Sequence, residues 1–181
     1  MRVIPSGLAD VLVLEPTVHG DARGRLFESY NRRTLANCAG VDVEFVQENQ
    51  SRSARHVLRG LHYQIGRPQG KLVRVLRGTI FDVAVDIRAS SPAFGRWVGS
   101  ILSDENQRML WIPPGFAHGF LVLSDSADCL YKVTDYWVPE CERGIRWADP
   151  DLAIAWPLTD VPVLSSKDQL APTLRDAEVY P

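Results

Sequence analysis

The feature that most limits the possible folds of this chain is a series of short segments in which apolar and polar residues alternate. The clearest segment is Ile80 to Ile87 (IFDVAVDI), where four apolar residues alternate with Asp82, Ala84 and Asp86. Comparable segments follow at Trp97 to Leu102, Gln107 to Ile112, Phe116 to Leu123 and Cys129 to Trp137. Turn residues separate them, and helical periodicity is almost absent before the C-terminus. The pattern predicts an all-β antiparallel sandwich or barrel.

The N-terminal part of the chain predicts more strands and one helix. Strand composition occurs at Leu8 to Val18, Leu26 to Tyr30 and Val43 to Gln50, and His19 to Arg25 is expected to form a turn. Thr34 to Ala39 predicts a short helix, and Gly40 is a natural C-cap for it. At the other end of the chain, Ser165 to Asp168 predicts the start of one short terminal helix.

Composition excludes several classes of protein. A length of 181 residues favours one domain, residues 1–181, with a Pro-rich tail at 158–181 that packs on it. The net charge of −2 argues against a nucleic-acid surface. No apolar run approaches the roughly 20 residues that cross a bilayer, and the N-terminus lacks the apolar centre of a signal peptide. We expect a cytoplasmic protein that binds neither nucleic acid nor membrane.

The three cysteines agree with a reducing compartment. Cys38, Cys129 and Cys141 are unevenly spaced and form no CxxC pair. Such spacing indicates reduced thiols rather than a disulfide framework.

The stretch from Val57 to Gly78 carries two residues that could perform chemistry. It predicts a hairpin with His62 on the first strand and Lys71 at the start of the second. A histidine transfers protons near neutral pH, and a lysine can stabilise a developing oxyanion. From spacing alone, His62 fits a core or strand histidine equally well. Lys71 is harder to explain structurally, because the strand that it begins is otherwise apolar.

One motif resembles the cupins, a family with a double-stranded β-helix, or jelly-roll, fold. Pro113 to His118 has the cupin form P-x-G-x-x-H. In the first cupin motif, however, Gln64 stands where the second histidine belongs, and Lys71 replaces the glutamate. A divalent metal needs about three or four N, O or S ligands, and an ammonium beside it would repel it. We therefore expect no metal and no other cofactor, and a site suited to proton transfer next to a carbonyl.

Longer strings resemble the dTDP-4-dehydrorhamnose 3,5-epimerase family over nearly the whole chain, from Asp21 to Asp168. The strings are Phe45 to Gln64, Gln69 to Arg88, Leu110 to Ser124, Leu130 to Trp137, Glu142 to Pro157 and Leu164 to Asp168. The resemblance implies a cupin jelly-roll with a few short helices, mainly C-terminal. It also implies a homodimer in which one subunit's N-terminal strand joins the partner's sheet, for which Leu8 to Val18 is a compatible segment.

The activity that the resemblance implies is an isomerase reaction at two carbons of a sugar nucleotide. The substrate would be a dTDP-4-keto-6-deoxyhexose, dTDP-4-dehydro-6-deoxy-D-glucose. Epimerisation at C3 and C5 through enolate intermediates would give dTDP-4-dehydro-L-rhamnose, as in deoxysugar biosynthesis.

The resemblance also implies roles for individual residues. His62 would be the base that removes the proton alpha to the C4 ketone, and Asp168 would orient its ring and stabilise the imidazolium. Lys71 and His118 would share the carbonyl side of the pocket and polarise the C4 ketone, and Lys71 would steady the enolate oxygen. Tyr131 would protonate the opposite face. Inversion requires groups on two faces, because a single group that returns its own proton retains the configuration.

A further set matches positions that hold the sugar and the diphosphate. The set is Arg23, Glu28, Gln47, Asn49, Arg59, His118, Trp137, Glu142 and Lys167. Arg23 and Arg59 suit phosphate oxygens, because a guanidinium can bind them bidentately. Trp137 falls where the family places an aromatic residue that stacks on thymine, and many members have tyrosine there.

Structural readings of the same residues remain open at this point. Tyr131 can be a cross-strand aromatic, and Asp168 can be a helix-capping carboxylate, because Ser165-x-x-Asp168 has capping-box spacing. Asp82 and Asp86 are interpreted as structural. Three functional alternatives also remain: an epimerase acting at C3 or C5 only, a metal-dependent cupin, and a non-catalytic cupin that only binds a sugar nucleotide.

Overall fold

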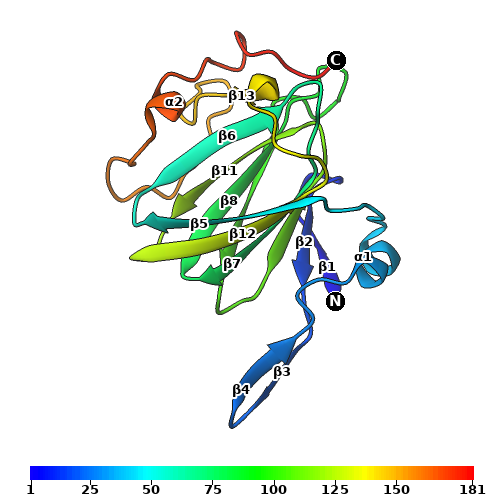
Figure 1. Cartoon of the computed structure of the whole chain (residues 1–181). Coiled ribbons are helices and arrows are strands. Elements are labelled where there is room, and N and C mark those ends of the chain that lie inside the picture. The colour runs from blue at the N-terminus through cyan, green and yellow to red at the C-terminus, as the bar shows by residue number, and fades with distance from the viewer.

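The computed structural model describes residues 1–181 and consists mainly of two facing antiparallel β-sheets (Figure 1). One sheet has six strands in the order β1 (Arg2–Pro5), β2 (Leu12–Glu15), β10 (Met109–Ile112), β7 (Lys71–Arg77), β12 (Ser126–Val133) and β5 (Gln47–Ala54). The other has five in the order β13 (Glu142–Gly144), β6 (Leu58–Gln64), β11 (Phe116–Val122), β8 (Thr79–Asp86) and β9 (Trp97–Ser103). The predicted all-β sandwich is confirmed.

Apolar side chains fill both the space between the sheets and the outer face of the five-stranded sheet. Ile80 and Ala84 of β8 point inward and pack with Val73 of β7. Val83 and Val85 point outward, into a second cluster that includes Trp156 and Leu174. The alternation predicted for β8 is therefore correct, and both of its faces are buried because the C-terminal segment covers the outer one (Figure 1).

The predicted hairpin between His62 and Lys71 is wrong. β6 belongs to the five-stranded sheet and β7 to the six-stranded sheet, so residues 65–70 cross from one sheet to the other. Glycine and proline mark a change of direction, but they do not say whether the next strand pairs with the previous one. As a consequence, His62 and Lys71 approach the space between the sheets from opposite walls.

The N-terminal strands also differ from the prediction. Leu8 to Val18 is not one strand, because Ser6 Oγ donates to Val11 O at 2.6 Å in a turn that precedes β2. His19 to Arg25 is not a turn: β3 (Val18–Asp21) and β4 (Gly24–Phe27) form a two-stranded hairpin that projects from the body (Figure 1). β5 begins at Gln47 rather than at Val43.

The short helices begin and end as their capping residues predict. α1 (Arg32–Ala39) starts two residues earlier than expected, after the N-cap Asn31, and ends at Gly40, whose φ of 68° is left-handed. α2 (Ser166–Gln169) follows Ser165, whose hydroxyl accepts a hydrogen bond from Asp168 N. A single 3-10 turn, η1, spans Pro139–Cys141. Neither helix has the length and apolar character needed to cross a membrane, and all three cysteines are free.

Candidate active site

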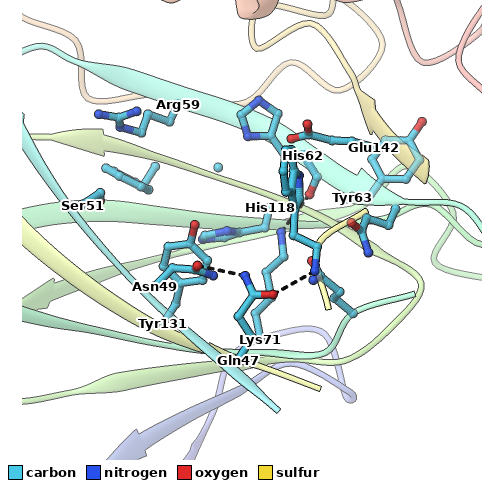
Figure 2. Close-up of a pocket in the computed structure, with 15 residues that line it drawn as sticks. Gln47, Asn49, Ser51, Arg59, His62, Tyr63, Lys71, His118, Tyr131 and Glu142 are labelled. Carbon is cyan, nitrogen blue, oxygen red and sulfur yellow. Dashed lines mark hydrogen bonds between the residues drawn. The ribbon is translucent and has the colours of Figure 1, made fainter. Parts of the chain in front are cut away.

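A cavity of about 390 Å³ lies between the two sheets (Figure 2). Its walls come from β5, β7 and β12 on one side and from β6 and β11 on the other. Among the residues predicted for the site, it is lined by Gln47, Asn49, Arg59, His62, Lys71, His118, Tyr131, Trp137 and Glu142. The fold therefore gathers in one place side chains that are far apart in the sequence.

His62 is held by a buried carboxylate. Its Nε2 lies 2.6 Å from Asp168 Oδ1, and the Asp168 side chain is only 4% exposed. Burial alone would raise the pKa of Asp168, but the hydrogen bond and the charge of His62 outweigh it and lower that pKa. An ionised Asp168 accepts a hydrogen bond from Nε2–H, which leaves the lone pair of Nδ1 free to take a proton.

α2 is what brings Asp168 to His62. The helix is one turn long, and Ser165 caps it by accepting from the Asp168 backbone N–H at 3.1 Å. The capping-box spacing therefore exists, while the carboxylate of Asp168 turns to His62. The structural and functional interpretations of this residue are compatible.

Lys71 crosses the cavity from the opposite wall. It is the first residue of β7, and its Nζ donates to the backbone oxygen of His62 at 3.1 Å. Only 7% of Lys71 is exposed. Burial lowers its pKa from 10.5 to about 8, although the carboxylates of Asp82 and Glu142 oppose the effect. At neutral pH the site therefore contains a poorly hydrated ammonium, which is a strong donor to a developing oxyanion.

A second histidine–carboxylate pair lies beneath the first. His118 Nε2 is 3.0 Å from both carboxylate oxygens of Asp82, which is fully buried. Burial lowers the pKa of His118 in spite of the nearby carboxylate. We therefore assign a neutral ring at pH 7 whose Nε2–H donates to Asp82.

Tyr131 lies on the wall opposite to His62. It belongs to β12, where it pairs in register with Val73 of β7 and Asn49 of β5. Burial raises the pKa of the Tyr131 phenol, while the charge of Arg59 opposes the increase. The hydroxyl is thus protonated at neutral pH and can act as an acid. Its placement on a sheet facing that of His62 provides groups on two sides of a bound ring.

β5 contributes a row of polar side chains to the cavity. Gln47, Asn49 and Ser51 are two residues apart and so share one face of the strand. Gln47 Nε2 donates to Asn49 Oδ1 at 2.9 Å. Ser51 Oγ is the buried side-chain polar atom that has no hydrogen-bond partner. Buried polar atoms are normally paired, so this hydroxyl is available to a ligand.

Arg59 stands at one end of the cavity, where two strands approach unusually closely. Its Nε donates to Ser53 Oγ at 3.0 Å, which leaves the terminal nitrogens open. The next residue, Gly60, has a φ of 111°, and a Cβ there would lie 2.6 Å from His118 O. Glycine is therefore required at this position to bring β6 against β11 and to place Arg59 and His62 on the same rim.

The other end of the cavity is formed by Trp137 and Glu142, and Lys167 lies behind Glu142. Trp137 is 53% exposed and lines the cavity with Glu142. Lys167 Nζ pairs with Glu142 Oε1. Burial alone would raise the pKa of Glu142, but this ammonium and the charge of His62 lower it. Lys167 does not line the cavity itself; it contacts the site through Glu142.

Arg23 and Glu28 lie outside the cavity of their own chain. Arg23 is in the turn of the β3–β4 hairpin, where its side chain is 90% exposed and pairs with Asp21. Glu28 directly follows β4 and accepts a hydrogen bond from Asn31 at 2.9 Å. In Figure 1 the hairpin extends away from the sandwich. A single chain therefore does not bring these two predicted residues to the others.

Comparison with known proteins places the chain in a family. The family model of dTDP-4-dehydrorhamnose 3,5-epimerase matches residues 5–176. The chain belongs to this family. A dTDP-4-dehydrorhamnose 3,5-epimerase of Pseudomonas aeruginosa is 57% identical over 181 residues, which is 100% of both chains.

Solved structures of this epimerase family confirm the jelly-roll fold. A Legionella pneumophila dTDP-6-deoxy-D-glucose-3,5-epimerase in complex with dTDP-4-keto-L-rhamnose is 52% identical, with a TM-score of 0.95 over 97% of this chain and 93% of that one. A 3'-monoepimerase of Streptomyces bikiniensis in complex with dTDP-quinovose is 36% identical, with a TM-score of 0.89 over 97% of this chain and 88% of that one.

The structure adds two residues to the site expected from the sequence. Asp82 is structural, as expected, and its structural part is to hold His118 inside the cavity wall. The available signal was a carboxylate on the same strand face as Ala84, which is an inward-facing position. Ser51 was not selected at all; its signal was the two-residue spacing with Gln47 and Asn49. No three His, Cys, Asp or Glu side chains are grouped so that they could hold a metal ion.

Proposed function

We propose that this protein epimerises dTDP-4-dehydro-6-deoxy-D-glucose at C3 and C5, giving dTDP-4-dehydro-L-rhamnose through enolate intermediates. The observation that carries the proposal is that His62 and Tyr131 line one cavity from facing sheets, with the Lys71 ammonium between them. Membership of the epimerase family and 57% identity to the Pseudomonas aeruginosa enzyme support it.

The first step is removal of a proton next to the C4 ketone. His62 Nδ1 takes the proton, because Nε2 is already bound to Asp168. The electron pair of the C–H bond moves into the ring and onto the C4 oxygen, which becomes an enolate. Lys71 donates to that oxygen, and Asp168 stabilises the imidazolium. The same ketone acidifies the protons on C3 and on C5, so one base can serve both centres.

Lys71 is the principal donor to the ketone in this scheme. His118 uses its Nε2–H for Asp82, so its other nitrogen could donate only if the ring were protonated. Because burial lowers the pKa of His118, that form is scarce at neutral pH. We propose that His118 shapes the carbonyl side of the pocket beside Lys71 and does not itself carry the charge.

The second step is protonation of the enolate from the other side. Tyr131 gives its phenolic proton to the carbon on the face opposite to His62, which inverts the centre. The phenolate that remains is stabilised by the charge of Arg59. Exchange with solvent then removes the extra proton from His62 and returns one to the Tyr131 phenolate. A ring flip, or a second presentation of the ring, brings the other carbon to the same pair.

The nucleotide would extend from the sugar toward the rims of the cavity. The terminal nitrogens of Arg59 suit the diphosphate oxygens, and Trp137 offers an exposed ring on which a base can stack. We propose that Gln47, Asn49 and the Glu142–Lys167 pair contact the polar groups of the substrate.

We further propose that the protein is a cytoplasmic homodimer in which Arg23 and Glu28 reach the pocket of a second copy. β2 pairs on both sides with strands of its own chain, whereas the β3–β4 hairpin joins neither large sheet. We therefore propose that the hairpin, rather than Leu8 to Val18, reaches the partner. Leu26 on the hairpin is 75% exposed, so a partner that covered the hairpin would also bury this apolar side chain. Light scattering that gave the mass of one chain under assay conditions would contradict this proposal.

We also propose that residues 1–181 form one domain on which the tail at 158–181 packs. Leu174 joins the outer apolar cluster, and the hydroxyls of Tyr63 and Tyr180 bind backbone oxygens across β6 and the tail.

Incubation of the enzyme with the keto-sugar nucleotide in D2O tests the function, with deuterium at C3 and C5 followed by NMR. We expect deuterium at both carbons. Deuterium at one carbon would indicate a monoepimerase, and none would indicate a binding protein. Stoichiometric iron, manganese or zinc in the active protein would instead favour a metal-dependent cupin.

Two variants separate the roles of base and acid in the same experiment. His62→Ala should abolish exchange at both carbons. Tyr131→Phe should still exchange at one carbon at least, because deprotonation does not need the acid. Tyr136→Phe is the matched control, because Tyr136 is 56% exposed and does not line the cavity. Complete loss of exchange in Tyr131→Phe alone would show that the assignment of roles is wrong.

A further inference from the structure

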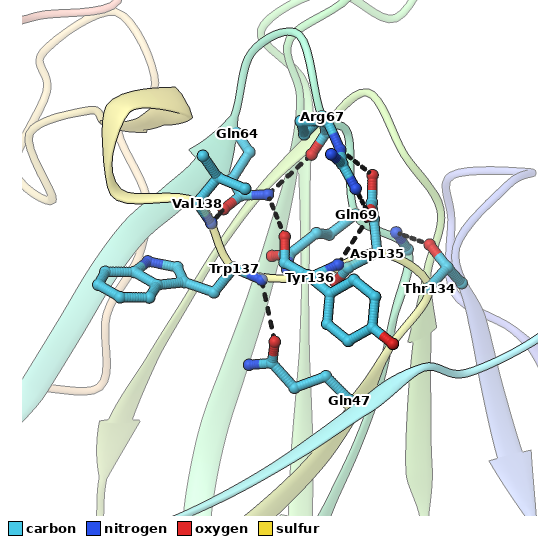
Figure 3. A network of polar contacts seen from close by, with 10 residues as sticks. Gln47, Gln64, Arg67, Gln69, Thr134, Asp135, Tyr136, Trp137 and Val138 are labelled. Carbon is cyan, nitrogen blue, oxygen red and sulfur yellow. Dashed lines mark hydrogen bonds and ion pairs between the residues drawn. The ribbon is translucent and has the colours of Figure 1, made fainter.

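Gln64 lies two residues after His62 on β6 and takes no part in the proposed chemistry. It is 2% exposed, and its amide hydrogen-bonds to the backbone of other segments (Figure 3). Nε2 donates to Arg67 O at 2.8 Å and to Tyr136 O at 3.2 Å, and Oε1 accepts from Val138 N at 2.7 Å. Both N–H bonds and one oxygen lone pair are therefore used within the protein.

The partners of Gln64 bracket Trp137. Tyr136 and Val138 are the two neighbours of Trp137 in the chain. Gln64 donates to the backbone oxygen of Tyr136 and accepts from the backbone N–H of Val138. The N–H of Trp137 donates to Gln47 Oε1 at 3.0 Å. Three consecutive residues of this loop are thus fixed to β6 on one side and to β5 on the other (Figure 3).

Trp137 depends on these backbone contacts because its ring is only weakly packed. The ring belongs to none of the apolar clusters. It also forms none of the aromatic pairs found in the protein, which include those of Trp111 and Trp156. Its side chain hydrogen-bonds to the carboxylate of Glu142. With 53% of the residue exposed, the ring can keep that contact and its place at the cavity only while the loop holds its Cα in position.

A second set of contacts joins the same loop to the crossing between the sheets. Arg67 Nε donates to Asp135 Oδ2 at 2.7 Å, and Gln69 Nε2 donates to Asp135 O at 2.8 Å. Thr134 and Gly70 are bonded through Gly70 N and Thr134 Oγ1 at 2.8 Å. Gln64 supplies the most deeply buried side chain of this network, and it touches both the crossing and the loop.

We propose that Gln64 is a positioning residue that sets the affinity of the pocket for the nucleotide by holding Trp137 at its edge. This inference rests on the proposed function, in which Trp137 stacks on the base. Gln64 lines the cavity, but its amide is bonded to the backbone of the crossing and of the loop. Its loss should therefore weaken nucleotide binding while the chemistry at His62 and Tyr131 continues.

The test is a double-mutant cycle of Gln64→Met and Trp137→Ala, read as the Kd for dTDP by calorimetry. Methionine keeps the length of the side chain and removes its hydrogen bonds. We expect Gln64→Met to raise the Kd about tenfold, as expected for about one net hydrogen bond, and to leave kcat within about twofold. In the Trp137→Ala background, Gln64→Met should change the Kd by less than about twofold.

Gln107→Met provides a matched control. Gln107 is also buried, at 6% exposure, and its amide donates to the backbone oxygen of Asp104 in a loop that does not line the cavity. Gln107→Met should leave the Kd for dTDP unchanged. If Gln64→Met does not fold, Arg67→Met replaces it, because the Arg67 side chain is 49% exposed and its loss frees the same loop from Asp135. That variant should raise the Kd about threefold, again only when Trp137 is present.

The outcomes separate the inference from the function on which it rests. Failure of the unmodified protein to bind dTDP would overturn the proposed function. Normal binding by that protein, together with an unchanged Kd in the Gln64 or Arg67 variant, would overturn the inference alone. If Gln64→Met raised the Kd for dTDP equally with and without the Trp137 ring, the inference would also be overturned, because Gln64 would then act on the pocket as a whole.

Discussion

Replacing Lys71 with methionine should make the protein more stable at neutral pH and nearly inactive. The residue is 7% exposed, and burial lowers its pKa from 10.5 to about 8. At pH 7 the folded protein therefore contains an ammonium that the unfolded chain would hydrate. The difference between these two pKa values corresponds to on the order of 3 kcal/mol of destabilisation. Methionine has a similar length and carries no charge.

The gain is partly offset by a lost hydrogen bond. Lys71 Nζ donates to His62 O at 3.1 Å, and an unsatisfied buried carbonyl costs about 1–3 kcal/mol. We therefore expect a net stabilisation of about 1 kcal/mol at pH 7, which raises the Tm by about 2–4 °C for a chain of this size. Loss of the donor to the enolate oxygen should lower kcat by about 100-fold or more.

The pH dependence gives the sharper measurement. Between pH 8 and 10.5 the unfolded chain keeps the Lys71 proton and the folded protein has lost it. The free energy of unfolding of the unmodified protein therefore rises with pH across this window, while that of Lys71→Met lacks this contribution. Urea unfolding at fixed pH should show the difference between the two proteins changing by about 3 kcal/mol, and kcat/KM of the unmodified enzyme should fall above pH 8.

A matched lysine on the same sheet serves as the control. Lys132 follows Tyr131 on β12 and pairs with Glu48 outside the cavity. Lys132→Met should leave kcat unchanged and should not raise the Tm. If the difference in unfolding free energy between the unmodified protein and Lys71→Met stayed flat from pH 7 to 10, the buried-ammonium reasoning would be refuted.

Two further substitutions test the groups around the base. Asp168→Asn should lower kcat about 100-fold with KM nearly unchanged, because removing the charge beside His62 costs about 2–4 kcal/mol of imidazolium stabilisation. Asp149→Asn, which alters another buried carboxylate that binds only backbone N–H groups, should cost stability and not kcat; equal losses of kcat in both would contradict the role of Asp168. Ser51→Ala should raise KM several-fold without destabilising the free protein, because the Ser51 hydroxyl has no hydrogen-bond partner to lose. Initial rates measure the KM, and urea unfolding measures the stability. A clear loss of stability would show that the hydroxyl is bound within the free protein.

Period-two alternation was sufficient to find the strands but not their partners. The faces of β8 were predicted correctly, because Val83 and Val85 must share a side. The alternation within β6 and β7 contains nothing that says they lie in different sheets, since both strands are largely buried. Strand pairing is decided by the packing of the whole sandwich, and a local turn signal cannot report it.

For the candidate site, too, the sequence identified residues but not where they lie in space. The resemblance to the family identified His62, Lys71 and Tyr131, and the fold places them around one cavity. It did not show that Arg23 would lie on a projecting hairpin, because position in the sequence does not fix position in space. Gln64 was noted only as a replaced metal ligand. Its actual partners are backbone atoms near Arg67 and Trp137, and no side-chain pattern can encode those contacts.

The crossing between the sheets suits the proposed chemistry better than the predicted hairpin would have done. In a hairpin, His62 and Lys71 would be neighbours on one wall, and the ammonium would lie on the same side of the sugar as the base. In the sandwich, Lys71 and Tyr131 come from one sheet and His62 from the other. A ring bound between the walls then meets the base on one face and the acid on the other, while Lys71 extends across the gap as far as the His62 backbone. Residues 65–70 make this crossing, and the Gln64 side chain joins them to the loop that carries Trp137.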